Sequence, residues 1–389
     1  MMTVGVVGAG AMGSGIAQVA LVHGHKVILA DLDDDATNRA RQLIEAAMRR
    51  DVEKGRLTSD AAKTALHQLV TVRLPLGLSE FAECSLVIEA IVEELKAKQS
   101  MFQFLESVVA PECILATNTS SLSVTSIAAA CEAPDRVVGM HFFHPAPVMP
   151  LVEIVPGAQT AKDITSSTRS IADGWDKITV MAADTPGFIV NRVARPFYGE
   201  SLRMLDEGFA DAPTIDWALR DIGGFRMGPF LLMDFIGNDI NYAVTESVWR
   251  ATYFDARYKP SLTQRRLVEA GWLGRKTGRG FYEYGPHAAP RAATEDRELG
   301  ESIVLRVVSL LVNEAVDVVH WRIATASDVD LAMTKGVNYP HGPLAWGNEI
   351  GLHRVLGEID RLRDETEDER YRPSPLLRRM VKEGRRFFE

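Results

Sequence analysis

Short apolar runs alternate with amphipathic stretches along the first part of the chain. Residues 4–7 predict a buried strand, residues 11–22 a helix, and residues 27–30 a second strand. Four further apolar runs, with helical stretches at 94–109 and 124–130 between the later ones, follow at 70–72, 86–88, 114–116 and 137–140. This alternation predicts a doubly wound parallel sheet of the α/β class, which residues 151–155 and 178–181 complete as additional strands.

A charged segment at residues 33–69 interrupts the strand pattern. It predicts one helix that ends near Gly55 and a second helix that begins after a cap supplied by Thr58 or Ser59. We therefore expect a helical hairpin to be inserted between two strands of the sheet.

The pattern becomes almost entirely helical after Asp184-Thr185-Pro186-Gly187. Three helices are predicted there, at residues 188–207, 214–221 and 229–250. A stretch rich in proline and alanine then predicts a linker. We expect an α/β domain at 1–183, an all-α domain at 184–285, a linker at 286–297 and a further helical segment at 298–389.

The last segment repeats the all-α domain. Positions from the first copy recur without gaps in the second, the pairs being Glu200 and Glu314, Asp216 and Asp330, Gly228 and Gly342, and Gly237 and Gly351. Further along, Tyr258-Lys259-Pro260-Ser261 matches Tyr371-Arg372-Pro373-Ser374. Two helical units with similar apolar faces can bury those faces on each other, so residues 298–389 are predicted to be a second, truncated copy.

The composition excludes several classes of protein. The chain of 389 residues is 46% hydrophobic and 24% charged, which is typical of a soluble globular protein with two or three domains. The net charge of −9, without a block rich in Lys or Arg, argues against nucleic acid and anionic membranes as partners. No apolar run is long enough to span a bilayer, and the N-terminus lacks the basic region of a signal peptide. Three cysteines without metal-type spacing fit a reduced, cytoplasmic setting.

The turn after the first strand carries a dinucleotide-binding fingerprint. Gly8 allows the tight turn, Gly10 lets backbone approach a pyrophosphate, and Gly13 allows the helix to pack closely on the strand. The N–H groups of the helix that begins at Ala11 and Met12 point at the phosphates. Asp31, at the end of the second strand, can accept hydrogen bonds from both ribose hydroxyls of NAD and repels the extra phosphate of NADP. The sequence therefore predicts NAD as the cofactor.

Polar residues follow two of the predicted strands, where a doubly wound sheet binds its ligands. Ser120 lies in the polar segment 117–123, and His141 and His144 lie in the next one. Glu153 lies within the apolar run 151–155, where a carboxylate is costly unless it is paired, and His141 is its natural partner. A carboxylate fixes which ring nitrogen carries the proton, so the pair predicts a general base.

Each of these residues also has a simpler interpretation. Glu153 can belong to a structural ion pair, and His141 alone can be an ordinary core or turn histidine. The spacing of His141 and His144 is also compatible with metal binding, but no further cluster completes a site, so we expect no metal. Asn191, near the start of the helical domain, is either a surface residue or a donor directed into the crevice.

Several motifs, in the same order and spacing, make the chain resemble the L-3-hydroxyacyl-CoA dehydrogenase family over about its first 285 residues. They are the fingerprint with Asp31 and the segments at 89–98, 118–122, 141–143, 147–149 with 151–153, 184–192 and 274–278. The repeated helical segment is similar to that of extended bacterial members of the family. Some of these act on longer or dicarboxylic acyl-CoAs in fatty acid or phenylacetate breakdown.

The resemblance implies NAD-dependent oxidation of an L-3-hydroxyacyl-CoA to the 3-oxoacyl-CoA. It implies that His141 is the general base, that Glu153 orients it, and that Ser120 and Asn191 bind the reacting oxygen and the acyl chain. Family positions for NAD are matched by Gly8, Gly10, Ala11, Met12, Gly13, Asp31, Glu93, Lys98, Ser120, His144 and Lys276. Lys54 matches a basic residue that meets CoA phosphate, and the family expectation for assembly is a homodimer through the helical domains.

The sequence departs from the family pattern at two positions. His144 stands where the family usually has Asn, and Ala47 stands where some relatives have a Ser near CoA. Two alternative functions also remain open: a dehydrogenase of small free hydroxy acids, similar to gulonate dehydrogenases, and a non-catalytic NAD-binding protein. The presence of Ser120, His141, Glu153 and Asn191 together argues against the second alternative.

Overall fold

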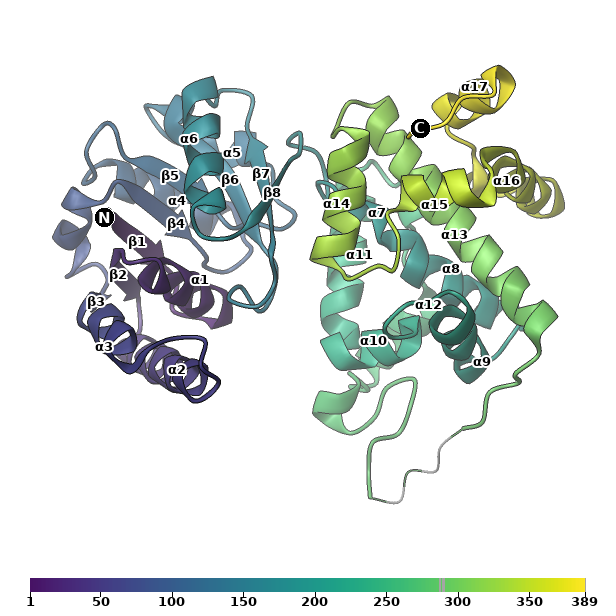
Figure 1. Ribbon diagram of the computed structural model, residues 1–389, viewed down its shortest axis with the longest axis horizontal. Coiled ribbons are helices and arrows are strands. Elements are labelled where there is room, and N and C mark those ends of the chain that lie inside the picture. Colours follow the sequence, from purple (N-terminus) through teal and green to yellow (C-terminus); the bar gives the residue numbers. More distant parts are fainter. Residues whose placement is uncertain (287, 289–290, 389) are drawn as a thin grey trace. The chain divides into compact units, whose positions relative to one another are not determined.

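The computed structural model describes residues 1–286, 288 and 291–388, and it divides into two compact units (Figure 1). The first unit covers Met1–Phe188 and the second Ile189–Glu389, and each is described by itself below. Part of the linker expected at 286–297, namely residues 287 and 289–290, lies outside the described residues.

The first unit is built on an eight-stranded sheet with the strand order β3-β2-β1-β4-β5-β6-β7-β8. The strands are β1 Thr3–Val7, β2 Lys26–Asp31, β3 Leu69–Arg73, β4 Leu86–Glu89, β5 Ile114–Thr117, β6 Val137–Phe142, β7 Leu151–Pro156 and β8 Ile178–Met181. The first six strands are parallel to one another. The carboxyl ends of β1 and β4 are therefore adjacent at one edge of the sheet, as a nucleotide-binding crevice requires.

The sheet is parallel as expected from β3 to β6, and it departs from this pattern at β7. This strand runs antiparallel to β6, and β8 then runs parallel to β7. The connection between β6 and β7 is only residues 143–150, which is too short for the crossover that parallel neighbours need. The antiparallel register places His141 directly opposite Glu153.

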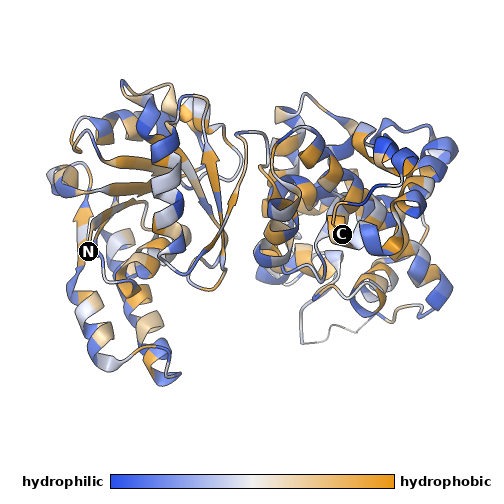
Figure 2. Cartoon of the chain, turned by 45° about the horizontal axis from the view of Figure 1, so that its top comes forward, coloured by the Kyte–Doolittle hydropathy of each residue, from blue (hydrophilic) through white to orange (hydrophobic). Residues whose placement is uncertain are grey.

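Helices cover both faces of this sheet because side chains of each strand alternate between the two sides. The helices are α1 Ala11–Val22, α2 Asp34–Glu53, α3 Ser59–His67, α4 Leu95–Glu106, α5 Val124–Ala128 and α6 Lys162–Asp173. One apolar core joins the sheet to α1, α2, α3 and α6, and the other joins it to α4 and α5. Figure 2 shows the hydrophobic colour concentrated in the strands. α2 and α3 form the hairpin, and the Thr58 hydroxyl caps α3 by accepting from the Ala61 N–H.

The second unit is helical. Its helices are α7 Val190–Val193, α8 Arg195–Asp206, α9 Ala212–Trp217, α10 Pro229–Ile236, α11 Asn238–Ala251, α12 Leu262–Glu269, α13 Arg297–His320, α14 Ala326–Gly336, α15 Pro343–Ile350, α16 Leu352–Thr366 and α17 Pro375–Glu383. The single helix expected at 229–250 is two helices, because Gly237 between them has a φ of 107°. Gly351 has a φ of 93° between α15 and α16, so the same break occurs at the matching position of the repeat.

The repeated positions make equivalent contacts in the two halves of the helical unit. The Asp216 carboxylate accepts from the N–H groups of Phe230 and Leu231 in the first turn of α10. Asp330 does the same for Leu344 and Ala345 in α15. Each carboxylate satisfies donors that a helix leaves unpaired at its N-terminus, which explains why an acid recurs at this spacing.

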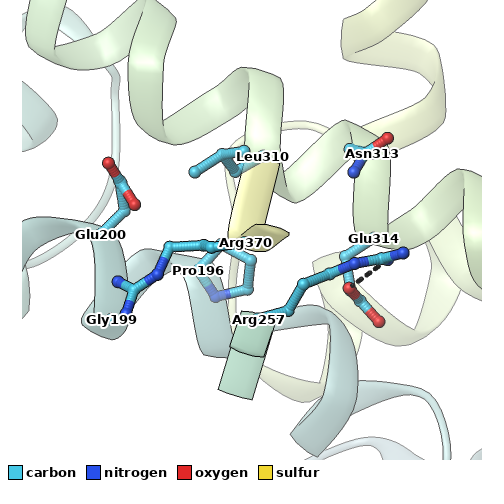
Figure 3. A pocket seen from close by; sticks show the side chains of 8 residues that line it. All are labelled: Pro196, Gly199, Glu200, Arg257, Leu310, Asn313, Glu314 and Arg370. Atoms are coloured by element: carbon cyan, nitrogen blue, oxygen red, sulfur yellow. Dashed lines mark hydrogen bonds and ion pairs between the residues drawn. The ribbon is translucent and has the colours of Figure 1, made fainter. Parts of the chain in front are cut away.

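Buried ion pairs join α7 and α8 of the first half to α13 of the second. The guanidinium of Arg306 donates to the Glu200 carboxylate at 2.5 Å and to the Tyr371 hydroxyl at 3.0 Å. At the matching positions, Arg192 donates to the Tyr258 hydroxyl at 3.1 Å, and Tyr258 is hydrogen-bonded to Glu314. A cavity of about 20 Å³ lies beside these groups. Figure 3 shows the residues that line it: Pro196, Gly199, Glu200, Arg257, Leu310, Asn313, Glu314 and Arg370.

Candidate active site

The glycine-rich turn between β1 and α1 has the geometry that a dinucleotide needs. Gly8 has a φ of 103°, and a Cβ at Gly13 would lie 1.7 Å from the Gly8 carbonyl oxygen. A Cβ at Gly10, in contrast, would meet no protein atom within 4 Å, so backbone is open to an approaching pyrophosphate there. The Asp31 carboxylate accepts from the Ala9 N–H at 2.7 Å, which holds the acid beside the turn. These residues therefore fit an NAD molecule.

A buried charge cluster lies at the end of β4. The Lys98 ammonium of α4 lies 2.6 Å from the Glu89 carboxylate and 3.2 Å from that of Glu93. Glu89 and Lys98 are almost fully buried, and Glu89 also accepts from the Thr117 hydroxyl at 2.7 Å. Because two buried charges need both pairing and further hydrogen bonds, the cluster fixes β4, β5 and α4 relative to one another.

Glu93 ties this cluster to the loop that carries Ser120. One of its carboxylate oxygens accepts from the Thr119 hydroxyl at 2.7 Å and from the N–H groups of Ser120 and Ser121 at 2.9 and 3.0 Å. Burial opposes ionisation of Glu93, but Lys98 and these hydrogen bonds outweigh burial and hold its pKa below the usual value. Glu93 is therefore an anion that positions the Ser120 loop.

His141 and Glu153 meet across the antiparallel pair β6–β7. The imidazole Nδ1 lies 2.6 Å from the Glu153 carboxylate, which is fully buried. The ring of Phe143 lies 4.5 Å from the imidazole, between centroids, and that of Phe188 lies 5.9 Å from it. An ionised carboxylate only accepts hydrogen bonds, so in contact with one Nδ1 is the donor, and Nε2 is the ring nitrogen that can exchange a proton with a substrate. This is the arrangement of a general base held by an acid.

A groove of about 480 Å³ runs along α1 in the same unit. It is lined by His144, Pro147 and Val148 of the β6–β7 connection and by four charged residues of the α2–α3 hairpin, Arg50, Asp51, Lys54 and Arg56. Ala47 is part of its wall. The groove thus brings the surroundings of His144 together with a part of the α2–α3 hairpin where three cationic side chains outnumber one carboxylate.

Two candidate residues belong to the helical unit. Asn191 lies in α7, and Lys276 lies in a short 3-10 helix, Arg275–Thr277. The Lys276 ammonium is paired with both oxygens of the Asp239 carboxylate, at 2.6 and 2.8 Å. Residues 1–286, 288 and 291–388 contain no group of three His, Cys, Asp or Glu side chains that could hold a metal ion. The helices of this part of the chain also include none long and apolar enough to cross a membrane.

The sequence analysis missed several residues around the site. Glu89 ends an apolar strand, and the argument that singled out Glu153 applies to it equally. Arg50 and Arg56 extend the positive charge at Lys54, and their closeness to it in the chain was a usable signal. Lys177, which donates to backbone carbonyls near His144, left no pattern in the sequence.

The strand order, the glycine-rich turn and the acid that ends β2 define the class of protein: a nucleotide-dependent oxidoreductase of the doubly wound α/β type. Comparison with known families narrows this class. The NAD-binding domain of 3-hydroxyacyl-CoA dehydrogenase matches residues 3–185, and the C-terminal domain of the same family matches residues 187–284 and 303–386. The chain belongs to the 3-hydroxyacyl-CoA dehydrogenase family, which confirms the resemblance, the fold class, the NAD cofactor and the dehydrogenase activity.

Individual relatives agree with this assignment. The 3-hydroxyadipyl-CoA dehydrogenase of Escherichia coli K12 is 37% identical over 463 residues, covering 97% of each chain. A probable 3-hydroxybutyryl-CoA dehydrogenase of Deinococcus radiodurans is 40% identical, covering 73% of this chain and all of the relative. The crystal structure of a 3-hydroxybutyryl-CoA dehydrogenase from Escherichia coli K12 matches with a TM-score of 0.92 at 36% identity, covering 98% of both chains.

Proposed function

We propose that His141 is the general base in the reversible oxidation of an L-3-hydroxyacyl-CoA to the 3-oxoacyl-CoA. The observation that carries this proposal is the 2.6 Å contact of His141 Nδ1 with Glu153, which leaves Nε2 to take the proton of the substrate hydroxyl. The hydroxyl-bearing carbon loses a hydride to NAD and the hydroxyl loses its proton to His141, so the alcohol becomes a ketone. Glu153 orients the ring and stabilises the imidazolium that forms.

The reacting oxygen is held by hydrogen-bond donors. We assign this role to Ser120 and Asn191, which also hold the acyl chain. The hydrogen bonds that Glu93 accepts from the Ser120 loop support the assignment, since they fix the backbone from which the Ser120 hydroxyl projects. Reactants held in this way react faster because the entropy of alignment is lost on binding.

NAD supplies the hydride acceptor, and residues of this chain bind and orient it. Gly8, Gly10, Ala11, Met12 and Gly13 receive the pyrophosphate, and Asp31 receives the ribose. Glu93, Lys98, Ser120, His144 and Lys276 complete the proposed cofactor residues. For Lys276 this implies that its ammonium exchanges its Asp239 partner for the cofactor.

The CoA part of the substrate occupies the groove along α1. Arg50, Lys54 and Arg56, of which Arg56 is paired with Asp51 at 3.7 Å, leave the hairpin end of the groove with the net positive charge that an anionic ligand needs on a protein of net charge −9. Its apolar wall at Pro147 and Val148 suits the pantetheine chain. This basic end favours a CoA thioester over a small free hydroxy acid, the alternative substrate.

We propose the domain division expected from the sequence: an NAD-binding domain at 1–183 with the hairpin at 33–69, a helical domain at 184–285, a linker at 286–297 and a second helical copy at 298–389. The proposed assembly is a homodimer through the helical domains, acting in the cytoplasm in fatty acid, butanoate or phenylacetate-type acyl-CoA metabolism. Sedimentation equilibrium of the purified chain tests the dimer, and a monomer at all concentrations contradicts it.

A panel of 3-oxoacyl-CoAs of increasing chain length tests the function. The purified chain is mixed with NADH and each thioester, and the loss of NADH absorbance is followed. We expect oxidation of NADH with at least one member, and the member with the highest kcat/KM defines the chain length. A matched set of free 3-oxo acids is the control, and activity with these acids alone contradicts the CoA proposal.

A further inference from the structure

Lys177 is a buried lysine between α6 and β8. The residue is 9% exposed. Its ammonium donates to the carbonyl oxygens of Ala146 at 2.6 Å and Met149 at 3.0 Å. Within the part of the chain that the structure describes, its polar contacts are backbone carbonyls, with no carboxylate in ion-pair distance. A buried ammonium without an anionic partner is costly, so its presence calls for an explanation.

Both carbonyls belong to the connection between β6 and β7, residues 143–150. This connection carries Phe143, whose ring lies against His141, and His144, which lines the groove. Its centre is a tight turn in which the Pro145 carbonyl accepts from the N–H groups of Val148 and Met149 at 2.9 and 3.0 Å. Lys177 therefore holds the two sides of one turn with a single group.

The same connection packs against the dinucleotide-binding helix. A Cβ at Gly15 of α1 would lie 3.1 Å from Pro147 Cδ and 3.2 Å from Ala146 Cβ, so the turn touches the helix at this point. Ala146 is almost fully buried there. On the other side, the Ile178 N–H donates to the Pro150 carbonyl at 2.8 Å. The connection is thus held between α1 and the segment that starts at Lys177.

We propose that Lys177 is a positioning residue for hydride transfer. Its bonds to Ala146 and Met149 hold the β6–β7 connection against α1, and this sets Phe143 behind the imidazole and His144 on the nicotinamide side of the site. The inference rests on the proposed function, because it assigns Lys177 a role in that reaction. A misplacement of about 1 Å in such a site costs up to about a hundredfold in rate.

The burial of Lys177 disfavours its charged form. Burial lowers its pKa to about 8, although Asp176 acts in the opposite direction. A site that only needed to be filled would be more stable with an apolar side chain of similar length. The loss of stability on burying the ammonium has a use here, because one donor must hold two carbonyls near a reacting centre.

The test compares Lys177→Met with Lys162→Met, an exposed lysine at the start of α6. Wild type and both variants are assayed with acetoacetyl-CoA and NADH, and the Kd for NADH is measured by fluorescence. For Lys177→Met we expect kcat to fall between about ten- and a hundredfold and the Kd for NADH to rise, with a smaller change in KM for acetoacetyl-CoA. Lys162→Met is expected to behave as wild type.

A double-variant cycle with His144→Ala separates positioning from general loss of structure. If Lys177 acts through the connection, Lys177→Met lowers kcat by a smaller factor in the His144→Ala background than in wild type. Unchanged kcat and NADH affinity in folded Lys177→Met, or full additivity in the cycle, overturns the proposal.

Should Lys177→Met fail to fold by circular dichroism, Lys177→Gln replaces it, and a folded, fully active Gln variant also overturns the proposal. A wild type that does not oxidise NADH with acetoacetyl-CoA or longer thioesters contradicts the proposed function instead.

Discussion

His141 Nδ1 and the Glu153 carboxylate lie 2.6 Å apart because the two residues are directly opposed in the β6–β7 ladder. The backbone hydrogen bonds of two buried strands therefore fix the orientation of the pair. The rings of Phe143 and Phe188 lie beside the imidazole and limit its other rotamers. An imidazole held in this way does not need to be ordered by the substrate.

Replacing the base tests its role directly. We expect His141→Ala to bind NADH as wild type does and to turn over at least about a hundredfold more slowly, because only the proton acceptor is lost. NADH fluorescence titration measures binding, and stopped-flow absorbance measures turnover. Turnover close to that of wild type would remove His141 from the mechanism.

Replacing the orienting acid should have a smaller but clear effect. Glu153→Gln keeps the size of the side chain and an oxygen that can accept from Nδ1, but it removes the charge that stabilises the imidazolium. We expect kcat to fall between about ten- and a hundredfold, with little change in the Kd for NADH. Glu112→Gln, at an exposed position of the same unit, is the control. Equal kcat values for the two variants would make Glu153 a structural residue only.

The sequence was most informative where a local pattern determines structure. The alternation of strands and helices, the glycine-rich turn and a carboxylate within an apolar run identified the sheet and the pair His141–Glu153. The pattern within the strands did not reveal that β7 is antiparallel; the signal lay in the connection at 143–150, which is too short for the crossover that parallel neighbours need. It also did not reveal Lys177, whose partners are backbone carbonyls 31 and 28 residues away. A backbone carbonyl has no sequence identity, so no motif can mark it.

The acid that ends β2 predicts the choice of cofactor. Asp31 accepts from the Ala9 N–H at 2.7 Å, so its charge lies beside the turn where the 2′-phosphate of NADP would add a second negative charge. We expect wild type to prefer NADH to NADPH. Asp31→Asn, which keeps an acceptor for Ala9, should lower kcat/KM for NADH about tenfold and reduce the preference. Parallel assays with both cofactors measure the change, and an unaltered ratio would argue against this role of Asp31.

The buried ion pair between the helical copies makes a prediction about stability. Arg306 is nearly buried and serves both Glu200 and Glu207, so Arg306→Met leaves the buried Glu200 without its charged partner. We expect a loss of about 3–5 kcal/mol in the free energy of unfolding. Arg297→Met, on the same helix but exposed and paired with Glu301, should cost at most about 1 kcal/mol. Urea unfolding followed by circular dichroism compares them, and similar midpoints would contradict the idea that this pair holds the copies together.

Lys177 also predicts how stability depends on pH. Its pKa is about 8 in the folded protein because burial disfavours the ammonium, whereas its usual value is 10.5. Between these two values the unfolded chain binds more protons at this site than the folded chain, so the site makes the free energy of unfolding rise with pH. Below the folded pKa the buried ammonium lowers stability by a constant amount. Lys177→Met has no such group, so wild type should gain stability relative to the variant as the pH rises from about 7 to about 10.

The neutral amine of Lys177 keeps two N–H donors, so its hydrogen bonds to Ala146 and Met149 persist as the pH rises and the ammonium loses its proton. Urea midpoints of wild type and Lys177→Met, measured at both ends of the pH range, give the difference at each pH. Taking the difference removes the titration of other groups, which both proteins share. A difference that is constant with pH would mean that Lys177 titrates alike in the folded and unfolded chain, and a difference of the opposite sign would mean that the folded protein favours the ammonium.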